Sequence, residues 1–239
     1  RAADDEAFTR SLVRAFVDGK IANMRTGLLR AGRRVPDPAV TGAAETLAIT
    51  RLVLADAKSY DELLGHEGSA SREYFGAWRQ LTGQEWGFTA RQRRPPPDPV
   101  NATLSFGYTL LTQEAVAALE AAGLDASVGF LHRARWGRPS LALDLMEEFR
   151  PVIVDAVTLR CLSTGIVRFE EFETAPDVGC RMNARARQAF LAAYERRMLT
   201  VFTHDGRRVS YRAGLGLQAR ALARAVLDPE RAYRPVRWK

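Results

Sequence analysis

Apolar residues recur at helical spacing along most of this chain, and this pattern limits its possible folds more than any other feature. In the first segment they fall at steps of three to five residues: Phe8, Leu12, Phe16, Ile21, Met24 and Leu28. This spacing places them on one face of an α-helix. Acidic residues at 4–6 lie where a helix begins, and Gly32 and Pro36 end the pattern. The sequence therefore predicts a long amphipathic helix.

The rest of the chain is also mainly helical in pattern. Further helices are predicted at Thr41 to about Lys58, Ser69 to about Leu81, Val100 to about Gly123, Ser140 onward, 181–198 and Leu215 to about Val226. Prolines interrupt the pattern at 95–97 and 99, which makes residues 91–99 a basic loop. An Asp-Gly turn at 205–206 predicts a small β-hairpin near 200–212. We expect a mainly α, multi-helix domain spanning 1–239.

Charge and composition limit the functional classes. The net charge of +7, from 35 basic and 28 acidic residues, favours a polyanionic partner such as nucleic acid, although a merely basic protein fits equally well. No apolar stretch has the length of a membrane span, so no membrane partner is expected. Cys161 and Cys180 lack the spacing of a zinc site, and no signal peptide is evident. A reducing cytoplasm is the expected location.

Two carboxylates on the helix after Ser140 are the first candidates for chemistry. Asp144 and Glu147 are three residues apart and share one helix face at the edge of an apolar stripe. Asp144 is flanked by apolar residues, so its carboxylate needs a cation, a hydrogen-bond donor or a metal. Glu148 fits a solvated acidic patch. Pro151 predicts a kink in the helix.

One histidine has suitable neighbours. His132 follows an apolar run at 128–131 and precedes a basic loop, whereas His204 fits a solvated turn. Carboxylates with one histidine suit Mg²⁺ or Mn²⁺, and such an ion can polarise a phosphodiester. From the residues alone Asp144 is the better ligand candidate than Glu147, and the reaction stays open.

Several separated segments resemble one family, the CRISPR-associated endonucleases that integrate new spacers into repeat arrays. They are LLGHEGSASREYF, RPPPDPVNATLSFGYTLL, GLDASVGFLH and SLALDLMEEFRPVIVD, with flanking helices VDGKIANMRTGLLR and RVSYRAGLGLQARALA. The motifs occur in the family's order, and the resemblance covers nearly the whole chain. The family also carries a β-rich N-terminal domain, which is expected to be absent from this chain.

The resemblance implies a metal site formed by Glu67 of the GxEG motif, His132 of the GFxH motif and Glu147. Asp144 matches a second acid near that site. Three residues fall in the motif beside it, where structural support and catalysis are equally open: Asn101, Ser105 and Tyr108. The arginines of two loops are candidates for DNA phosphate contacts: Arg91, Arg93, Arg94, Arg133, Arg135 and Arg138.

The implied activity is that of an endonuclease and integrase dependent on Mg²⁺ or Mn²⁺, in which a DNA 3′-hydroxyl attacks a phosphodiester at a repeat boundary. Implied partners are double-stranded and branched DNA, a second copy in a homodimer and a small ferredoxin-like subunit, with a fused or associated nuclease or polymerase domain as a further expectation. The implied location is the prokaryotic cytoplasm. Alternatives are a non-catalytic DNA-binding scaffold and a metallohydrolase of small phosphates. Titration with a divalent metal and assays on DNA and on a small phosphomonoester distinguish these three functions.

Overall fold

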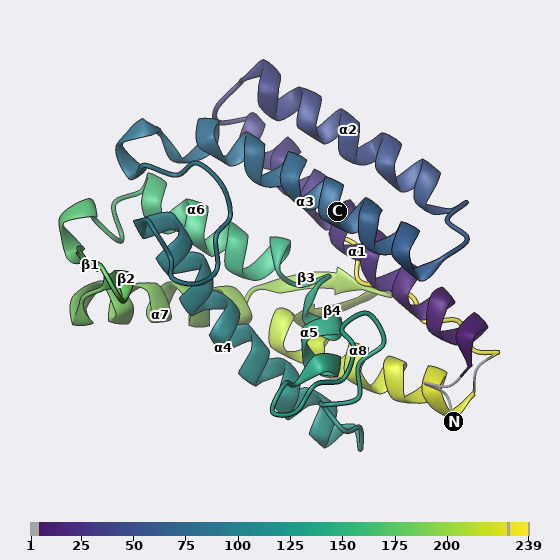
Figure 1. Ribbon diagram of the computed structural model, residues 1–239. Helices are drawn as coiled ribbons and strands as arrows, with labels where there is room; N and C mark the ends of the chain where they lie inside the picture. The colour runs from purple at the N-terminus through teal and green to yellow at the C-terminus, as the bar shows by residue number, and fades with distance from the viewer. Residues whose placement is uncertain (1–4, 229, 239) are drawn as a thin grey trace.

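The computed structural model describes residues 5–228 and 230–238 and confirms a mainly α fold (Figure 1). The α-helices are α1 (Glu6–Gly32), α2 (Pro38–Leu54), α3 (Tyr60–Thr82), α4 (Pro99–Ala121), α5 (Ser140–Met146), α6 (Ala156–Ser163), α7 (Ala184–Met198) and α8 (Tyr211–Leu227). Short helices occur at Gln84–Trp86, Pro151–Asp155 and Phe169–Glu171. The strands are β1 (Phe172–Ala175), β2 (Gly179–Met182), β3 (Val201–His204) and β4 (Arg207–Ser210).

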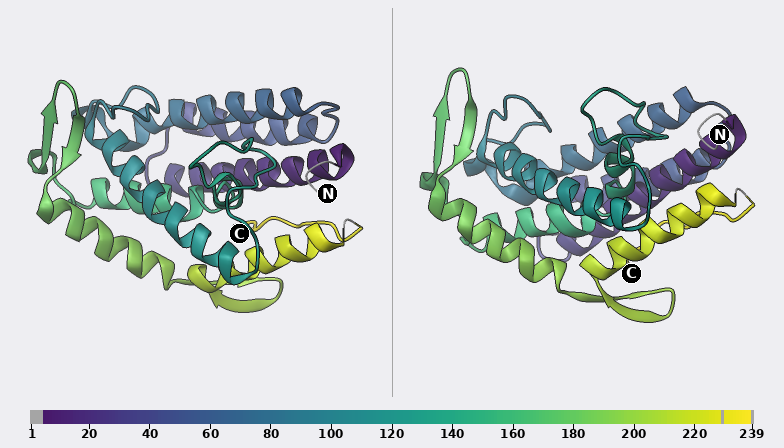
Figure 2. Two further views of the ribbon diagram at one scale, coloured as in Figure 1. Left: turned by 60° about the horizontal axis from the view of Figure 1, so that its bottom comes forward. Right: turned by 90° about the horizontal axis from the view of Figure 1, so that it is seen from below.

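The helices form two groups around a shared apolar core. α1, α2 and α3 contact one another and run side by side, while α4 lies below them in the view of Figure 1 and packs against α5 and α8. α7 packs against α6 and α8 (Figure 2). The predicted apolar stripe of α1 is buried, including Leu12, Phe16 and Ile21. This arrangement leaves α1, α3 and α4 around the segment that carries the predicted acids.

Capping side chains set the helix boundaries, and they correct three predicted starts. Polar side chains accept a backbone N–H at the first turn of six helices: Asp5, Asp37, Ser59, Asp98, Asn183 and Ser210. The helices predicted to begin at Thr41, Ser69 and Leu215 therefore begin earlier, because their caps lie upstream. The change matters most for α3. It places the GxEG segment, and with it Glu67, inside a helix.

A second hairpin was not predicted, and the predicted helix at 181–198 starts too early. β1 pairs with β2 in antiparallel register, with Phe172 opposite Met182, and α7 begins only after Asn183. Gly179 has φ +74°, and a Cβ there would lie 2.5 Å from the carbonyl oxygen of Pro96. Such a glycine is compatible with a tight turn and close backbone contact. The predicted hairpin is confirmed as β3–β4, with positive φ at Asp205 and Gly206.

The interruption predicted at Pro151 is confirmed. α5 ends at Met146, and a π-helical turn at Pro151–Asp155 precedes α6. Proline removes a helical hydrogen bond and crowds the preceding turn, and π-helical turns are frequent at functional sites. The whole segment 147–155 is buried.

The assignment of Glu148 to a solvated patch is wrong. Its carboxylate is fully buried and accepts hydrogen bonds from the hydroxyl of Tyr233 (2.5 Å), the amide of Gln218 (3.1 Å) and the backbone N–H of Val236 (2.5 Å). Burial raises the pKa of Glu148 to about 7. These bonds tie the C-terminal segment to the break after α5. Sequence spacing missed this because the partners lie about seventy or more residues downstream.

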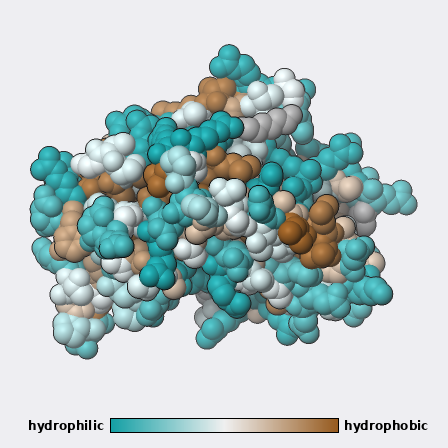
Figure 3. Space-filling view, turned by 90° about the horizontal axis from the view of Figure 1, so that it is seen from above, coloured by the Kyte–Doolittle hydropathy of each residue, from teal (hydrophilic) through white to brown (hydrophobic). Residues whose placement is uncertain are grey.

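The surface is polar with scattered apolar patches, as the face seen from above shows (Figure 3). α2 carries three large apolar side chains exposed by 45% or more: Ile49, Leu52 and Val53. Within the described residues, no helix combines the length and apolar character needed to cross a bilayer. Cys161 and Cys180 are both buried and free.

Candidate active site

A cleft lies between α1, α3, α4, the loop at 89–93 and the segment after α5, and Glu67 is the predicted acid that lines it. The cleft has a volume of about 460 Å³. Polar and charged side chains from these parts line it: Lys20, Glu67, Ser71, Arg72, Arg91, Arg93, Tyr108, Arg150 and Asp155. A polar cleft of this kind, bounded by buried ionisable groups, is a candidate site for catalysis.

Asp144 fixes the position of His132. Its side chain is fully buried and accepts backbone N–H bonds from Phe130 (2.6 Å), Leu131 (3.0 Å) and His132 (2.8 Å). It also lies 2.7 Å from Nδ1 of His132. Burial raises the pKa of Asp144, although the His132 ring and the backbone donors oppose the shift. Both carboxylate oxygens are thus engaged, and Nε2 of His132 remains on the other side of the ring.

The loop before His132 is shaped by a glycine of the GFxH motif. A Cβ on Gly129 would lie 2.4 Å from the carbonyl oxygen of His132 and 2.7 Å from the side chain of Ser140. Ser140 in turn donates to the carbonyl of Arg133 at 3.1 Å. Any larger residue at 129 would push the histidine loop away from α5. The motif therefore reflects close packing as well as chemistry.

A lysine that the sequence analysis overlooked joins the other two predicted ligands. The ammonium of Lys20, 4% exposed on α1, contacts Oε1 of Glu67 and lies 2.7 Å from Oε2 of Glu147. Burial alone would lower the pKa of Lys20, but the charges of Glu147 and Glu67 outweigh burial and raise it. Periodicity contained a signal, because Lys20 lies four residues from both Phe16 and Met24 on the buried stripe of α1.

Glu147 contacts three basic side chains of the site: Lys20, Arg150 and His132. Its Oε1 lies 3.3 Å from Arg150 and 3.9 Å from Nε2 of His132. Burial would raise the pKa of Glu147, yet Arg150, Lys20 and His132 together lower it to about 2. The carboxylate is therefore ionised at neutral pH. The structure brings Glu67, His132 and Glu147 together through these contacts, with Asp144 behind His132.

A divalent cation bound by both carboxylates would need the place that the Lys20 ammonium occupies between them. Among the residues described, no three His, Cys, Asp or Glu side chains converge closely enough to hold an ion, and Lys20 lies between the two carboxylates. Oε2 of Glu147 is buried, and its partner is the Lys20 ammonium at 2.7 Å. Two carboxylates and one imidazole are ligands that Mg²⁺ and Mn²⁺ accept.

The residues of the second motif hold an arginine and a second buried acid. Asn101 and Ser105 accept hydrogen bonds from the Arg91 guanidinium at 2.8 and 3.0 Å. The hydroxyl of Tyr108 instead donates to Asp155 at 2.6 Å. Asn101 and Ser105 thus orient a basic side chain in the cleft. Sequence reasoning missed Asp155, although a lone acid in the apolar run PVIVDAV was a signal.

Only two of the six predicted phosphate-contacting arginines line the cleft. Arg91 and Arg93 do so, whereas Arg133 lines a different cavity beside Tyr60. The others lie outside the linings of both cavities: Arg94, Arg135 and Arg138. Arg150, not proposed from sequence, also lines the cleft. Proximity in sequence to a motif was therefore a poor guide to proximity in space.

Asp155 gives a pH prediction. Burial raises the pKa of Asp155 to about 6 from its ordinary 3.8, although hydrogen bonds from Tyr108 and Tyr74 oppose the shift. The folded state then binds more protons than the unfolded state in this window, so its stability falls as pH rises. Relative to Asp155→Asn, which does not titrate, the wild-type free energy of unfolding should fall by about 3 kcal/mol between pH 3.5 and 7. Urea unfolding of both proteins across this range measures the difference, and a constant difference would contradict the shift.

Comparisons with known proteins identify the family of this chain. A family model described as "CRISPR associated protein Cas1" matches residues 1–196. A Rhodospirillum rubrum protein named "CRISPR-associated endonuclease Cas1 2" is 42% identical over 241 residues, which cover 95% of this chain and 70% of that protein. A Geobacter sulfurreducens protein named "CRISPR-associated exonuclease Cas4/endonuclease Cas1 fusion" is 41% identical over 93% of this chain, which spans only 42% of its length.

Solved structures share the fold. A chain of a "Cas6-RT-Cas1--Cas2 complex" matches all of this chain with a TM-score of 0.88 and 27% identity, over 26% of its own length. A "Casposase bound to integration product" matches with the same TM-score at 23% identity, over 67% of its length. The second likeness concerns the fold alone. In both, this helical arrangement is one part of a longer chain.

Proposed function

Since this chain belongs to the Cas1 family of CRISPR-associated proteins, we propose that residues 1–239 form the helical catalytic domain of a metal-dependent DNA endonuclease and integrase that inserts new spacers into CRISPR arrays. The observation that carries the proposal is the convergence of Glu67 from α3 and Glu147 from the end of α5 on one buried cation, with His132 beside Glu147. Two buried carboxylates held together by a replaceable positive charge suit a divalent metal.

The proposed ligands are Glu67, Glu147 and Nε2 of His132, for Mg²⁺ or Mn²⁺. Such an ion would polarise the phosphodiester and offset charge on its oxygens. Asp144 is proposed as the residue that orients His132, as carboxylates commonly do for metal-bound histidines. Arg91, Arg93 and Arg150, which line the cleft, would hold the DNA phosphates that flank the reacting bond. The attacking group would be the 3′-hydroxyl of the incoming DNA.

The proposed partners follow from the same membership. They are double-stranded and branched DNA, a second copy of the chain and a small ferredoxin-like subunit. Relatives that carry a Cas4 exonuclease, or that occur in a complex with a reverse transcriptase and Cas2, by their printed names, support a fused or associated nuclease or polymerase. The proposed setting is the prokaryotic cytoplasm. A homodimer would be detected by light scattering of the purified protein.

Lys20 provides a test that separates the enzyme from a non-catalytic scaffold. Lys20→Met removes the ammonium that lies between Glu67 and Glu147, and it leaves Arg150 as the cation beside Glu147. Mn²⁺ should therefore bind the variant at least about tenfold more tightly than the wild type, because breaking a buried ion pair costs several kcal/mol and a metal can offset that cost. Without metal, the melting temperature of the variant should fall.

Calorimetric titration with Mn²⁺ measures the change. Lys58→Met is the matched control, because Lys58 is exposed and should leave the affinity unaltered. If Lys20→Met bound Mn²⁺ no more tightly than wild type, Lys20 would not occupy the place of the ion. If the wild type bound no Mn²⁺ at all, even with DNA present, the scaffold would be the better description.

A further inference from the structure

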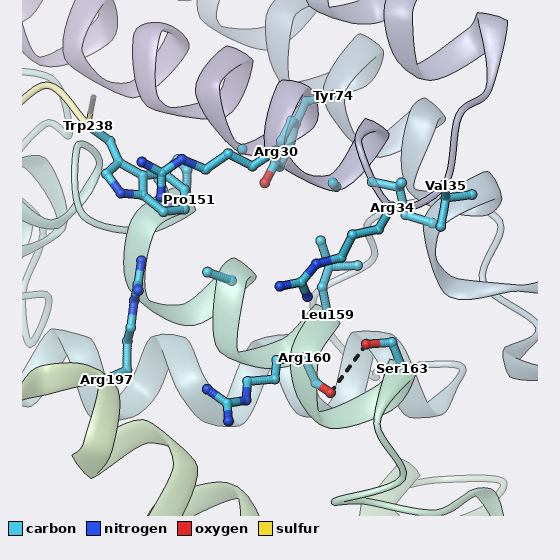
Figure 4. Close-up of a pocket in the computed structure, with 14 residues that line it drawn as sticks. Arg30, Arg34, Val35, Tyr74, Pro151, Leu159, Arg160, Ser163, Arg197 and Trp238 are labelled. Carbon is cyan, nitrogen blue, oxygen red and sulfur yellow. Dashed lines mark hydrogen bonds between the residues drawn. The ribbon is translucent and has the colours of Figure 1, made fainter. Parts of the chain in front are cut away.

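A second cavity lies between α1 and α6, separate from the active-site cleft (Figure 4). Its volume of about 320 Å³ falls in the range of small-ligand sites. Tyr74 lies between this cavity and the active-site cleft. Its ring lines this cavity, and its hydroxyl donates at 3.0 Å to Asp155, which lines the active-site cleft.

The lining of this cavity is basic. Four arginines from α1, the turn after it, α6 and α7 contribute to it: Arg30, Arg34, Arg160 and Arg197. None of the described lining residues is acidic. Arg160 and Arg197 also line an adjoining smaller cavity together with Arg196, so the positive charge continues beyond it. A site of this sign attracts anions, and phosphate groups above all.

Arginine is abundant in this chain, and a few arginines elsewhere pair with acids. Arg51 pairs with Asp18, Arg185 with Glu171, and Arg212 with both Glu114 and Glu195. Within the part of the chain that the structure describes, no carboxylate pairs with the guanidinium groups of the second cavity at 34, 160 and 197. The repulsion between these three guanidinium groups is therefore not offset by a paired carboxylate.

Aromatic and backbone contacts hold two of the guanidinium groups in place. Arg30 lies 3.8 Å from the centre of the Trp238 ring, and Arg197 lies 5.1 Å from it. Nε of Arg197 also donates to the carbonyl of Val152 at 2.7 Å. Figure 4 shows Arg30 beside Trp238, with Arg34 and Arg197 directed toward the space between the helices. Donors fixed in this way lose little side-chain entropy when a phosphate binds.

The other part of the lining is apolar. Val35, Leu81, Pro151 and Leu159 line the same cavity. A ligand that meets both parts carries a phosphate and a flat apolar group of moderate size. A nucleotide has this composition, and the volume accommodates one.

We propose that this cavity binds a nucleotide, with its phosphate on Arg34, Arg160 and Arg197 and its base against the apolar wall. The nucleotide is either free or a unit of a single strand, since both offer the same phosphate and base. The proposal goes beyond integration chemistry, because none of these arginines lines the active-site cleft and no metal is required.

The test uses charge reversal at the two exposed arginines, Arg34 and Arg160. The double variant Arg34→Glu/Arg160→Glu should bind ADP, or a short 5′-phosphorylated single-stranded oligonucleotide, at least about tenfold more weakly than wild type. Calorimetry with ADP and fluorescence anisotropy with the oligonucleotide, both in EDTA, measure the two affinities. EDTA keeps the result independent of the proposed metal site.

Arg220→Glu/Arg224→Glu on α8 is the matched control. Both residues are exposed, and the change in net charge is identical. A selective loss of ADP affinity identifies a free nucleotide as the ligand, and a selective loss confined to the oligonucleotide identifies a unit of a strand. If the two charge-matched variants bound both ligands equally well, the cavity would not be a nucleotide site. That result would leave the active-site proposal intact, just as failure of Mn²⁺-dependent cleavage would leave this one intact.

Discussion

Replacing Glu147 with glutamine should lower Mn²⁺-dependent cleavage of branched DNA by at least about 100-fold, with an equal loss of integration when the ferredoxin-like subunit is present. The reason is the position of Glu147 at the centre of the site. It is buried, ionised and in contact with Lys20, Arg150 and His132 at once. Glutamine preserves its shape but removes the charge that a divalent ion requires. Glu67→Ala and His132→Ala should have effects of the same order.

The control for this experiment is Glu45→Gln on α2, an identical change at an exposed glutamate, which should leave cleavage unaltered. Circular dichroism at the assay temperature should show that Glu147→Gln is folded, because Glu147 also has structural contacts. Full activity in a folded Glu147→Gln, Glu67→Ala or His132→Ala protein would refute the proposed ligand set. Cleavage of a small phosphomonoester, with none of DNA, would instead favour the metallohydrolase alternative.

The second large effect is expected at Asp144. Substitutions there should change both the free energy of unfolding and the orientation of the His132 ring. Asp144→Ala leaves two buried backbone N–H groups, one part-buried N–H and one ring nitrogen without their acceptor. Unsatisfied buried donors cost about 1–3 kcal/mol each. We therefore expect the free energy of unfolding to fall by about 4 kcal/mol. Urea unfolding in EDTA measures this loss without any contribution from metal.

Asp144→Asn tests more specifically whether Asp144 orients the His132 ring. Its oxygen can still accept from Phe130 and Leu131, but its amide then faces His132. The imidazole would have to move its proton from Nδ1 to Nε2 in order to accept from that amide. Nε2 would no longer be available to a metal, so Mn²⁺ affinity should fall about 10- to 100-fold in a protein that remains folded.

Nitrogen NMR of the His132 ring distinguishes the two tautomers directly. Asp125→Asn is a suitable control, because Asp125 lies exposed in the same connector and should change neither the tautomer nor Mn²⁺ affinity. An unchanged tautomer together with unchanged Mn²⁺ affinity in Asp144→Asn would show that Asp144 is only a structural acceptor for the loop.

Local patterns in the sequence predicted much of the fold. The stripe that begins at Phe8 and Leu12 indicated α1, and the Asp-Gly turn indicated the β3–β4 hairpin, because helix periodicity and turn preference act over a few residues. The same patterns placed Asp144 in apolar surroundings and anticipated that it needs a partner. The family resemblance added Glu67, which no periodicity argument had indicated.

Errors arose where burial depended on distant parts of the chain. Glu148 was assigned to solvent because a helix pattern reports only its own residues, while the donors that bury it come from α8 and the C-terminal segment. The β1–β2 hairpin was missed because its four-residue strands carry a weak alternation and depend on contact with the 95–97 loop.

By itself the sequence determined a mainly helical chain, an interruption at Pro151 and, by resemblance, the identity of the acids and the histidine. The tertiary structure decided how they meet. Lys20 lies 47 residues from Glu67 in the chain, and only the packing of α1 against α3 and the segment after α5 places its ammonium between Glu67 and Glu147. Charges interact this strongly only when packing removes the water around them, and packing is a property of the assembled helices.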